Sequence, residues 1–96
     1  MLNRKQQDLY NAFYESTHNP EHLDRRTELL VGLAAAMALD CQPCTRYYLK
    51  LCRQYGVNQG ELGDVLAKVM AVSAGQKRLQ ATEVLQEPGL TFEPPT

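Results

Sequence analysis

The sequence contains no long run of charge of one sign. Its 96 residues carry a net charge of −1, and basic residues are adjacent only in pairs such as Arg25-Arg26. Binding nucleic-acid phosphates needs a concentrated basic face, so nucleic acid is not expected as a partner. The sequence also lacks a long apolar run: the longest, residues 29–39, has 11 residues, whereas a membrane-spanning helix needs about 20. No membrane association is therefore expected.

The sequence has few cysteines and no pattern of a secretory signal. Residues 1–8 are polar and include no apolar core, so they do not read as a signal peptide, and a cytoplasmic location is expected. The chain has three cysteines, an odd number, and two of them form a C-x-x-C motif. A structural disulfide framework is then not expected, which leaves a redox or a metal-binding role for the motif.

Helical periodicity is present along nearly the whole chain, and no strand pattern or repeat interrupts it. The length predicts a single domain, residues 1–96, with a core over about 20–87 and an extended or disordered tail over 88–96. Apolar spacing predicts an all-α fold of at least five helices. The first covers about 3–16, the second runs to about 39, the third covers about 41–55, the fourth follows residue 58, and a fifth ends at Pro88-Gly89.

Capping residues set the predicted helix ends. Asp24 and Asp40 are placed to cap the second and third helices, and Asn58-x-x-Glu61 resembles a capping box for the fourth. Gly75 is expected to end or bend that fourth helix. The second helix is apolar on every side after residue 29, which is typical of a helix buried in a core or between subunits.

Cys41-Gln42-Pro43-Cys44 is the strongest chemical signal in the chain. The motif opens a predicted helix, where free backbone N–H groups and the helix dipole favour negative charge. A thiolate is stabilised there, and two cysteines three positions apart can close a disulfide on that turn. The motif therefore holds a candidate nucleophile and its resolving partner, with no cofactor beyond the redox-active disulfide.

Two other interpretations of the motif remain open. A structural zinc site needs four ligands, and His18 and His22 are the candidates for the other two. They precede a helix of about 15 residues and the cysteines follow it, so roughly 22 Å separates them and only a site shared between subunits is feasible. Alternatively, the pair is inert and buried. Cys52 and Tyr48 lie on the same helical stripe, and Cys52 is expected to be a small buried hydrophobe.

Residues 23–48, LDRRTELLVGLAAAMALDCQPCTRYY, are similar to the core of a known family. An acid-capped helix rich in Leu and Ala is followed by C-x-x-C at the start of the next helix, then by a G-V-N-Q-G-E-L turn and another Ala-rich helix. Over about residues 20–87 the chain resembles the carboxymuconolactone decarboxylase and alkylhydroperoxidase (AhpD-like) family. The resemblance implies a bundle of five to six helices and a homo-oligomer, often a trimer or hexamer.

The resemblance also implies an activity: its redox members act as peroxidases or disulfide reductases on a peroxide or disulfide substrate, with a thiol electron donor. In them the second cysteine attacks the peroxide and the first resolves it, so Cys44 would attack and Cys41 resolve; thioredoxin-type logic would make Cys41 the attacker. Decarboxylase activity is less expected, because nothing here suggests a site for an acidic lactone beyond scattered arginines.

The chain departs from the family's peroxidase motif at two positions. Where the motif has His, four residues after the second cysteine, this chain has Tyr48, and where it has Glu, this chain has Leu29. Tyrosine has a pKa near 10, so Tyr48 cannot act as a base at neutral pH but can donate a hydrogen bond. Glu28 lies one residue early and would contribute only if the helix shifts or its side chain reaches around.

Three functions remain after these departures. The first is a dithiol oxidoreductase or peroxidase-like enzyme that uses Cys41 and Cys44, with Tyr48 and Glu28 in a partial proton relay. The second is a metal-binding or redox-sensing module, and the third is a non-catalytic oligomeric scaffold. The first is preferred because a C-x-x-C at a helix start can exchange disulfides without a dedicated histidine.

Overall fold

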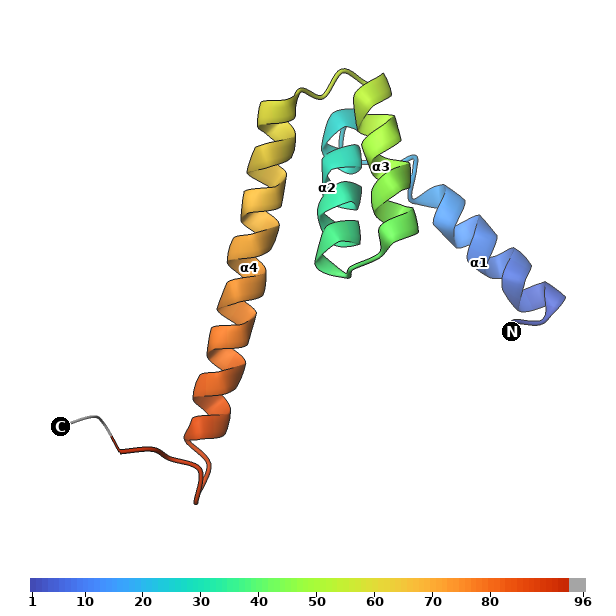
Figure 1. Ribbon diagram of the computed structural model, residues 1–96. Coiled ribbons are helices and arrows are strands. Elements are labelled where there is room, and N and C mark those ends of the chain that lie inside the picture. Colours follow the sequence, from blue (N-terminus) through green and yellow to red (C-terminus); the bar gives the residue numbers. More distant parts are fainter. Residues whose placement is uncertain (94–96) are drawn as a thin grey trace.

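The computed structural model describes residues 1–93 as four α-helices joined by turns (Figure 1). No strand occurs in this range, which confirms the all-α prediction. The predicted count of five to six helices is wrong for these residues. The helices are α1 (Arg4–Ser16), α2 (Arg25–Ala38), α3 (Gln42–Gln54) and α4 (Gln59–Leu85).

The helix count differs because Gly75 does not end α4. The predicted fourth and fifth helices are one continuous helix, Gln59–Leu85. A glycine inside a helix costs about 1 kcal/mol relative to alanine, and the good helix formers on both sides of Gly75 outweigh that. The helix instead ends at Leu85, just before Pro88-Gly89, and Gly89 has a φ of 84°. Residues 88–90 form a turn, and 91–93 have no regular secondary structure, whereas 94–96 of the predicted tail lie outside the described residues.

Most predicted helix caps are confirmed. Asp24 accepts a hydrogen bond from the backbone N–H of Thr27, and Asn58 forms the predicted capping box with Glu61. The third helix was also expected to close at Gly56, and Gly56, with a φ of 82°, follows the C-cap of α3. The role predicted for Asp40 is wrong, because Cys41 is the N-cap of α3. Asp40 instead adopts a left-handed conformation (φ 56°) that closes the turn after α2, which Asp tolerates better than most residues.

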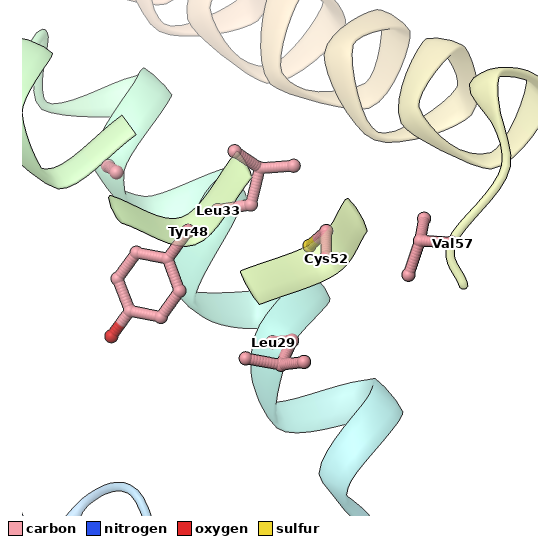
Figure 2. Close-up of a cluster of buried hydrophobic side chains, with 6 residues drawn as sticks. Leu29, Leu33, Tyr48, Cys52 and Val57 are labelled. Atoms are coloured by element: carbon pink, nitrogen blue, oxygen red, sulfur yellow. The ribbon is translucent and has the colours of Figure 1, made fainter. Parts of the chain in front are cut away.

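The core lies where α2 packs against α3 and against the start of α4 (Figure 2). Leu29 and Leu33 of α2 and Cys52 of α3 are the most completely buried side chains. One edge of α2 remains open, since Val31 is 54% exposed, so the apolar surface of this helix is only partly covered within one chain. Six residues form the buried apolar cluster: Leu29, Leu33, Ala36, Tyr48, Cys52 and Val57.

An ion pair between Arg26 and Glu61 holds the starts of α2 and α4 together. The guanidinium donates to both carboxylate oxygens, with Arg26 Nε at 3.1 Å from Glu61 Oε2. The hydrogen bonds from Arg26, helped by the backbone N–H of Asn58, lower the pKa of Glu61. The pair fixes α4 at its N-terminal end, while its other half runs beyond the ends of α2 and α3 (Figure 1).

α1 projects away from the other helices and contains no buried residue (Figure 1). Its connection to the body runs through the aromatic residues Tyr14 and His18, near the turn before α2. Among residues 1–93, none of the helices has the length and apolarity needed to cross a membrane.

Candidate dithiol site

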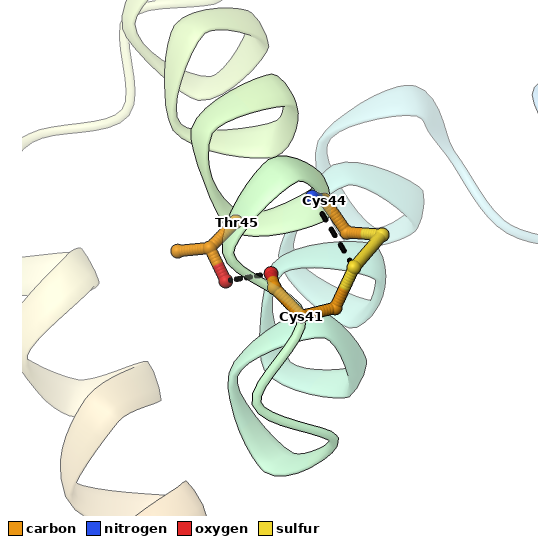
Figure 3. The surroundings of a disulfide bond; sticks show 3 residues. All are labelled: Cys41, Cys44 and Thr45. Atoms are coloured by element: carbon orange, nitrogen blue, oxygen red, sulfur yellow. Dashed lines mark hydrogen bonds between the residues drawn. A yellow bond between two sulfur atoms is a disulfide. The ribbon is translucent and has the colours of Figure 1, made fainter.

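Cys41 and Cys44 are joined by a disulfide at the start of α3 (Figure 3). Their Cα atoms are 5.3 Å apart. The backbone N–H of Cys44 donates a hydrogen bond to Cys41 Sγ at 3.3 Å, and Thr45 Oγ1 donates to the Cys41 carbonyl oxygen at 2.8 Å. A backbone N–H that has no acceptor within the helix thus donates to a sulfur atom. This hydrogen bond would stabilise a thiolate on Cys41 after reduction.

The two cysteines differ in their surroundings. Cys44 packs against the buried apolar cluster, whereas Cys41, the N-cap, does not belong to the residues that contact it. Pro43 occupies the first turn, where its missing N–H costs no helical hydrogen bond. Cys41 is therefore the outer cysteine of the pair and Cys44 the inner one.

Tyr48 lies one helical turn after Cys44 and packs over Gly32 of α2. Its side chain is in the core, with 9% of the residue exposed, and a methyl group on Gly32 would overlap its ring. Burial, and next a hydrogen bond with Tyr14, raise the pKa of Tyr48 to about 12. The hydroxyl therefore stays protonated at neutral pH, so it can donate a hydrogen bond but cannot act as the general base.

Glu28 does point into the molecule, although the sequence placed it one residue out of register. Its side chain is 8% exposed and accepts a hydrogen bond from Arg25 Nη1 at 2.7 Å. Its charge is among the causes that raise the pKa of Tyr48, so the two groups face the same region. Leu29, at the family's Glu position, is instead fully buried in the core.

The sequence suggested His18 only as a metal ligand shared between subunits, and its position beside Glu28 was not predicted. Its side chain is 13% exposed, and Nδ1 lies 3.8 Å from Glu28 Oε1. This nitrogen is buried without a hydrogen-bond partner. The ring meets Tyr14 edge-on at 4.9 Å and lies 5.9 Å from Tyr47. His22, by contrast, is exposed.

These side chains form a polar cluster between α1, α2 and α3, which consists of Tyr14, His18, Glu28, Tyr47 and Tyr48. Two of its members, Tyr48 and Glu28, were predicted with the cysteines as site residues. Within residues 1–93, no group of three or more His, Cys, Asp or Glu side chains is placed to hold a metal ion.

Comparison with known proteins shows which family the chain belongs to. The model of the carboxymuconolactone decarboxylase family matches residues 5–87. The chain belongs to that family. The match confirms the resemblance and extends it through α1. No curated protein matches the chain significantly.

A solved structure of similar fold supports the architecture. The chain is similar to the crystal structure of a protein from Methanobacterium thermoautotrophicum, with a TM-score of 0.78 and 24% sequence identity. The likeness covers 85% of this chain and 92% of that one. At this identity the likeness establishes the fold alone.

In this family member the buried state of Tyr48 predicts a specific pH dependence of stability. An exposed tyrosine in the unfolded chain has a pKa near 10, and the folded value is about 12. The contribution of Tyr48 is fully present below about pH 10 and is lost as pH rises towards 12, because ionisation favours the unfolded chain. Urea unfolding at pH 9 and pH 11 should therefore show a smaller loss of stability for Tyr48→Phe than for wild type. Equal losses would contradict the buried hydroxyl.

A groove borders the opposite side of the first turn of α3. It has a volume of about 670 Å³ and lies between α4 and the connection from α2 to α3, with Met37, Thr45 and Met70 in its lining. Thr45 and the disulfide lie on opposite sides of the turn (Figure 3). The groove therefore does not lead directly to the sulfur atoms.

Proposed function

We propose that this family member is a dithiol–disulfide oxidoreductase with peroxidase-like activity, and that Cys41 and Cys44 alternate between dithiol and disulfide. The main support is the hydrogen bond from the Cys44 N–H to Cys41 Sγ. The two cysteines also form a disulfide at the start of a helix. Family membership supports it, because the family includes alkylhydroperoxidases as well as decarboxylases.

Disulfide exchange would begin at the outer cysteine. The Cys41 thiolate attacks one sulfur of a substrate disulfide, forms a mixed disulfide and releases one substrate thiolate. Cys44 then loses its proton and attacks Cys41 Sγ, which releases the second substrate thiolate and closes the Cys41–Cys44 bond. The substrate gains two electrons and the pair loses two. An external dithiol reverses the steps and restores the reduced pair.

Reduction of a peroxide follows the role that the family resemblance gives to Cys44. The Cys44 thiolate attacks one peroxide oxygen, which breaks the O–O bond, leaves a sulfenic acid and releases an alcohol or water after protonation. Cys41 then displaces water from the sulfenic acid and forms the disulfide. Tyr48, one turn from Cys44, donates a hydrogen bond to the leaving oxygen, because its hydroxyl keeps its proton.

The polar cluster would supply the general base, because Tyr48 cannot act as one. His18 Nδ1 is buried without a partner and lies 3.8 Å from Glu28, a separation that a bound substrate can shorten. His18, oriented by Glu28, would accept the thiol proton through the Tyr48 hydroxyl. The imidazole that the family places on the cysteine helix would thus come from the turn after α1.

Replacement of His18 tests this relay. His18→Asn should lower peroxide turnover at least tenfold, since a general base contributes about 10²-fold or more. The rate of disulfide exchange should stay within about twofold of the wild-type rate, because that reaction depends on the thiolate stabilised at the helix start. The matched control is His22→Asn, an exposed histidine of the same connection. Equal losses in both reactions would indicate a structural role for His18 and remove it from the relay.

Mass spectrometry of the intact chain tests the function itself. Reduced protein, mixed with one equivalent of an alkyl hydroperoxide or of a small-molecule disulfide, should lose two hydrogens and form the Cys41–Cys44 bond. Addition of dithiothreitol should restore the reduced mass. A chain that stays reduced with both oxidants, or one that accumulates only overoxidised cysteine, contradicts the proposal.

A further inference from the structure

Four of the five tyrosines of the chain lie in one continuous row of aromatic rings, here called the aromatic row. Tyr10 stacks on Tyr14 of the same helix, with ring centroids 6.2 Å apart and an interplanar angle of 17°. Tyr14 in turn meets His18 at 4.9 Å, and His18 lies 5.9 Å from Tyr47. Tyr47 meets Tyr48 edge-on at 5.1 Å. Every step lies within the usual range of ring contact, about 4.5–7 Å, so the row has no gap.

The aromatic row runs from the protein surface to the dithiol. Tyr10, at one end, is 53% exposed and belongs to α1, the helix that projects from the body (Figure 1). Tyr48, at the other end, is buried one helical turn after Cys44, which packs against the same buried cluster. The hydroxyls of Tyr14 and Tyr48 also share a hydrogen bond, which helps to raise the pKa of Tyr48. The row therefore connects the inner sulfur atom with solvent.

The rings of this row suit the transfer of single electrons. Tryptophan and tyrosine are the aromatic side chains that give up an electron most easily, and this chain has no tryptophan. A phenol that loses an electron becomes a strong acid, so it is oxidised readily only where its proton can leave. Burial opposes that loss at Tyr48, whereas water can accept the proton of the exposed Tyr10. An unpaired electron at the inner end is therefore driven outward.

We propose that the aromatic row carries an unpaired electron from Cys44 to Tyr10, and that this transfer restores the Cys44 thiol after one-electron oxidation. The oxidant is an alkoxyl radical, which forms when a ferrous ion splits the O–O bond of an organic peroxide into that radical and hydroxide. The radical takes the hydrogen atom of the Cys44 thiol, becomes an alcohol and leaves a thiyl radical. This one-electron chemistry goes beyond the two-electron cycle of the proposed function.

The repair moves one hydrogen atom inward while the unpaired electron moves outward. The thiyl radical takes an electron and a proton from the Tyr48 hydroxyl, which restores the S–H bond and leaves a tyrosyl radical. Tyr14 replaces both, because its electron crosses the ring contacts and its proton crosses the hydrogen bond between the hydroxyls. Tyr10 then gives an electron to Tyr14 through the stacked rings and its own proton to water, from which Tyr14 recovers one. A small reductant of the ascorbate class returns a hydrogen atom to Tyr10.

The transfer would protect the cysteine from irreversible oxidation. A thiyl radical adds dioxygen and proceeds towards sulfinic and sulfonic acids, which a thiol donor does not reduce. The same rings also attach α1 to the body, so a purely structural role must be separated from the redox role. Replacement of tyrosine by phenylalanine separates them, because phenylalanine keeps the ring but has no hydroxyl and is much harder to oxidise.

Photolysis of an S-nitrosothiol tests the path, because it makes a radical at one known sulfur atom. In a Cys41→Ser, Cys52→Ala background only Cys44 carries a thiol, and a small S-nitroso donor converts it to S-nitrosocysteine. Light then breaks the S–N bond and gives the Cys44 thiyl radical and nitric oxide. A nitrone spin trap captures the unpaired electron where it stops, and tandem mass spectrometry locates the adduct. We expect the adduct mainly on Tyr10.

Substitutions in the row and outside it give the comparison. Tyr14→Phe should lower the Tyr10 adduct at least tenfold and leave the adduct on Cys44 or Tyr48. Tyr55→Phe is the matched control: Tyr55 is 49% exposed and belongs to none of the ring pairs found within residues 1–93, so the Tyr10 adduct should stay within about twofold. Tyr10→Phe changes only an exposed ring and should move the adduct to Tyr14, which tests the path even where Tyr14→Phe fails to fold.

Three results would overturn the inference. The first is an adduct that stays on Cys44 when the row is intact, and the second is a Tyr10 adduct that survives Tyr14→Phe in a folded chain. The third is a Tyr10 yield that rises with protein concentration, because the electron would then pass between molecules. Light and not peroxide makes the radical, so a chain without peroxide or disulfide turnover can still pass this test. Failure of the path is thus distinguishable from failure of the proposed function.

Discussion

Replacement of either Cys41 or Cys44 by serine should lower turnover at least 100-fold with both a peroxide and a disulfide substrate. A serine hydroxyl does not form the thiolate that attacks, and it cannot close the disulfide that completes the cycle. Steady-state assays with an external dithiol as electron donor measure the loss. Cys52→Ala is the matched control and should retain activity, because Cys52 is fully buried and burial raises the pKa of its thiol.

The two serine variants should fail in different ways. With a disulfide substrate, Cys44→Ser should accumulate a mixed disulfide on Cys41, because the resolving thiol is missing. Cys41→Ser should accumulate little, since its remaining cysteine is the inner one that packs against the core. If both variants keep full turnover with both substrates, the dithiol mechanism is excluded.

Gly32→Ala should destabilise the fold by about 1–3 kcal/mol, the usual cost of inserting a group into a packed core. Helix propensity alone predicts the opposite sign, since alanine is favoured over glycine by about 1 kcal/mol inside a helix. The difference arises because the new methyl group would overlap the ring of Tyr48. Displacement of that ring should also reduce peroxide turnover, since Tyr48 lies next to Cys44 on α3.

Gly63→Ala is the matched control for this substitution. Gly63 lies within α4 and has no atom within 4 Å of the position that a Cβ would take. Its replacement should leave stability unchanged or raise it by up to about 1 kcal/mol. Urea unfolding of the two variants gives the comparison. Equal stabilisation by both would mean that Tyr48 does not pack over Gly32.

The sequence was most informative where a local rule decides the structure. The side chains of Asp24 and Asn58 bond to backbone N–H groups a few residues away, so the starts of α2 and α4 could be predicted. Gly75 misled because a helix tolerates one glycine when its neighbours are good helix formers. The prediction that Asp40 caps α3 was wrong because Asp is common both at N-caps and at left-handed turn positions. Here Cys41 is the N-cap and Asp40 lies in the turn.

In the candidate site, too, the sequence predicted contacts within one helix but not contacts between different elements. The spacing of Cys41 and Cys44 places both on one helical turn, so their proximity follows from the sequence. The inward direction of Glu28 depends on how α2 packs, and the position of His18 depends on the path of the turn after α1. His18 lies 26 residues before Cys44, on a different element, so no spacing rule connects them. Only the packing of three helices brings His18 to Glu28.

The central claim is that Cys41 and Cys44 form a reactive dithiol, and native alkylation rates test it most directly. The reduced protein is treated with iodoacetamide between pH 5 and pH 9, and modification of each cysteine is followed by mass spectrometry. We expect Cys41 to react at pH 7 at least tenfold faster than an unstructured cysteine, and Cys52 to stay unmodified until the protein unfolds. If neither Cys41 nor Cys44 reacts in the folded protein, the pair is structural or metal-bound, and the proposed oxidoreductase function is wrong.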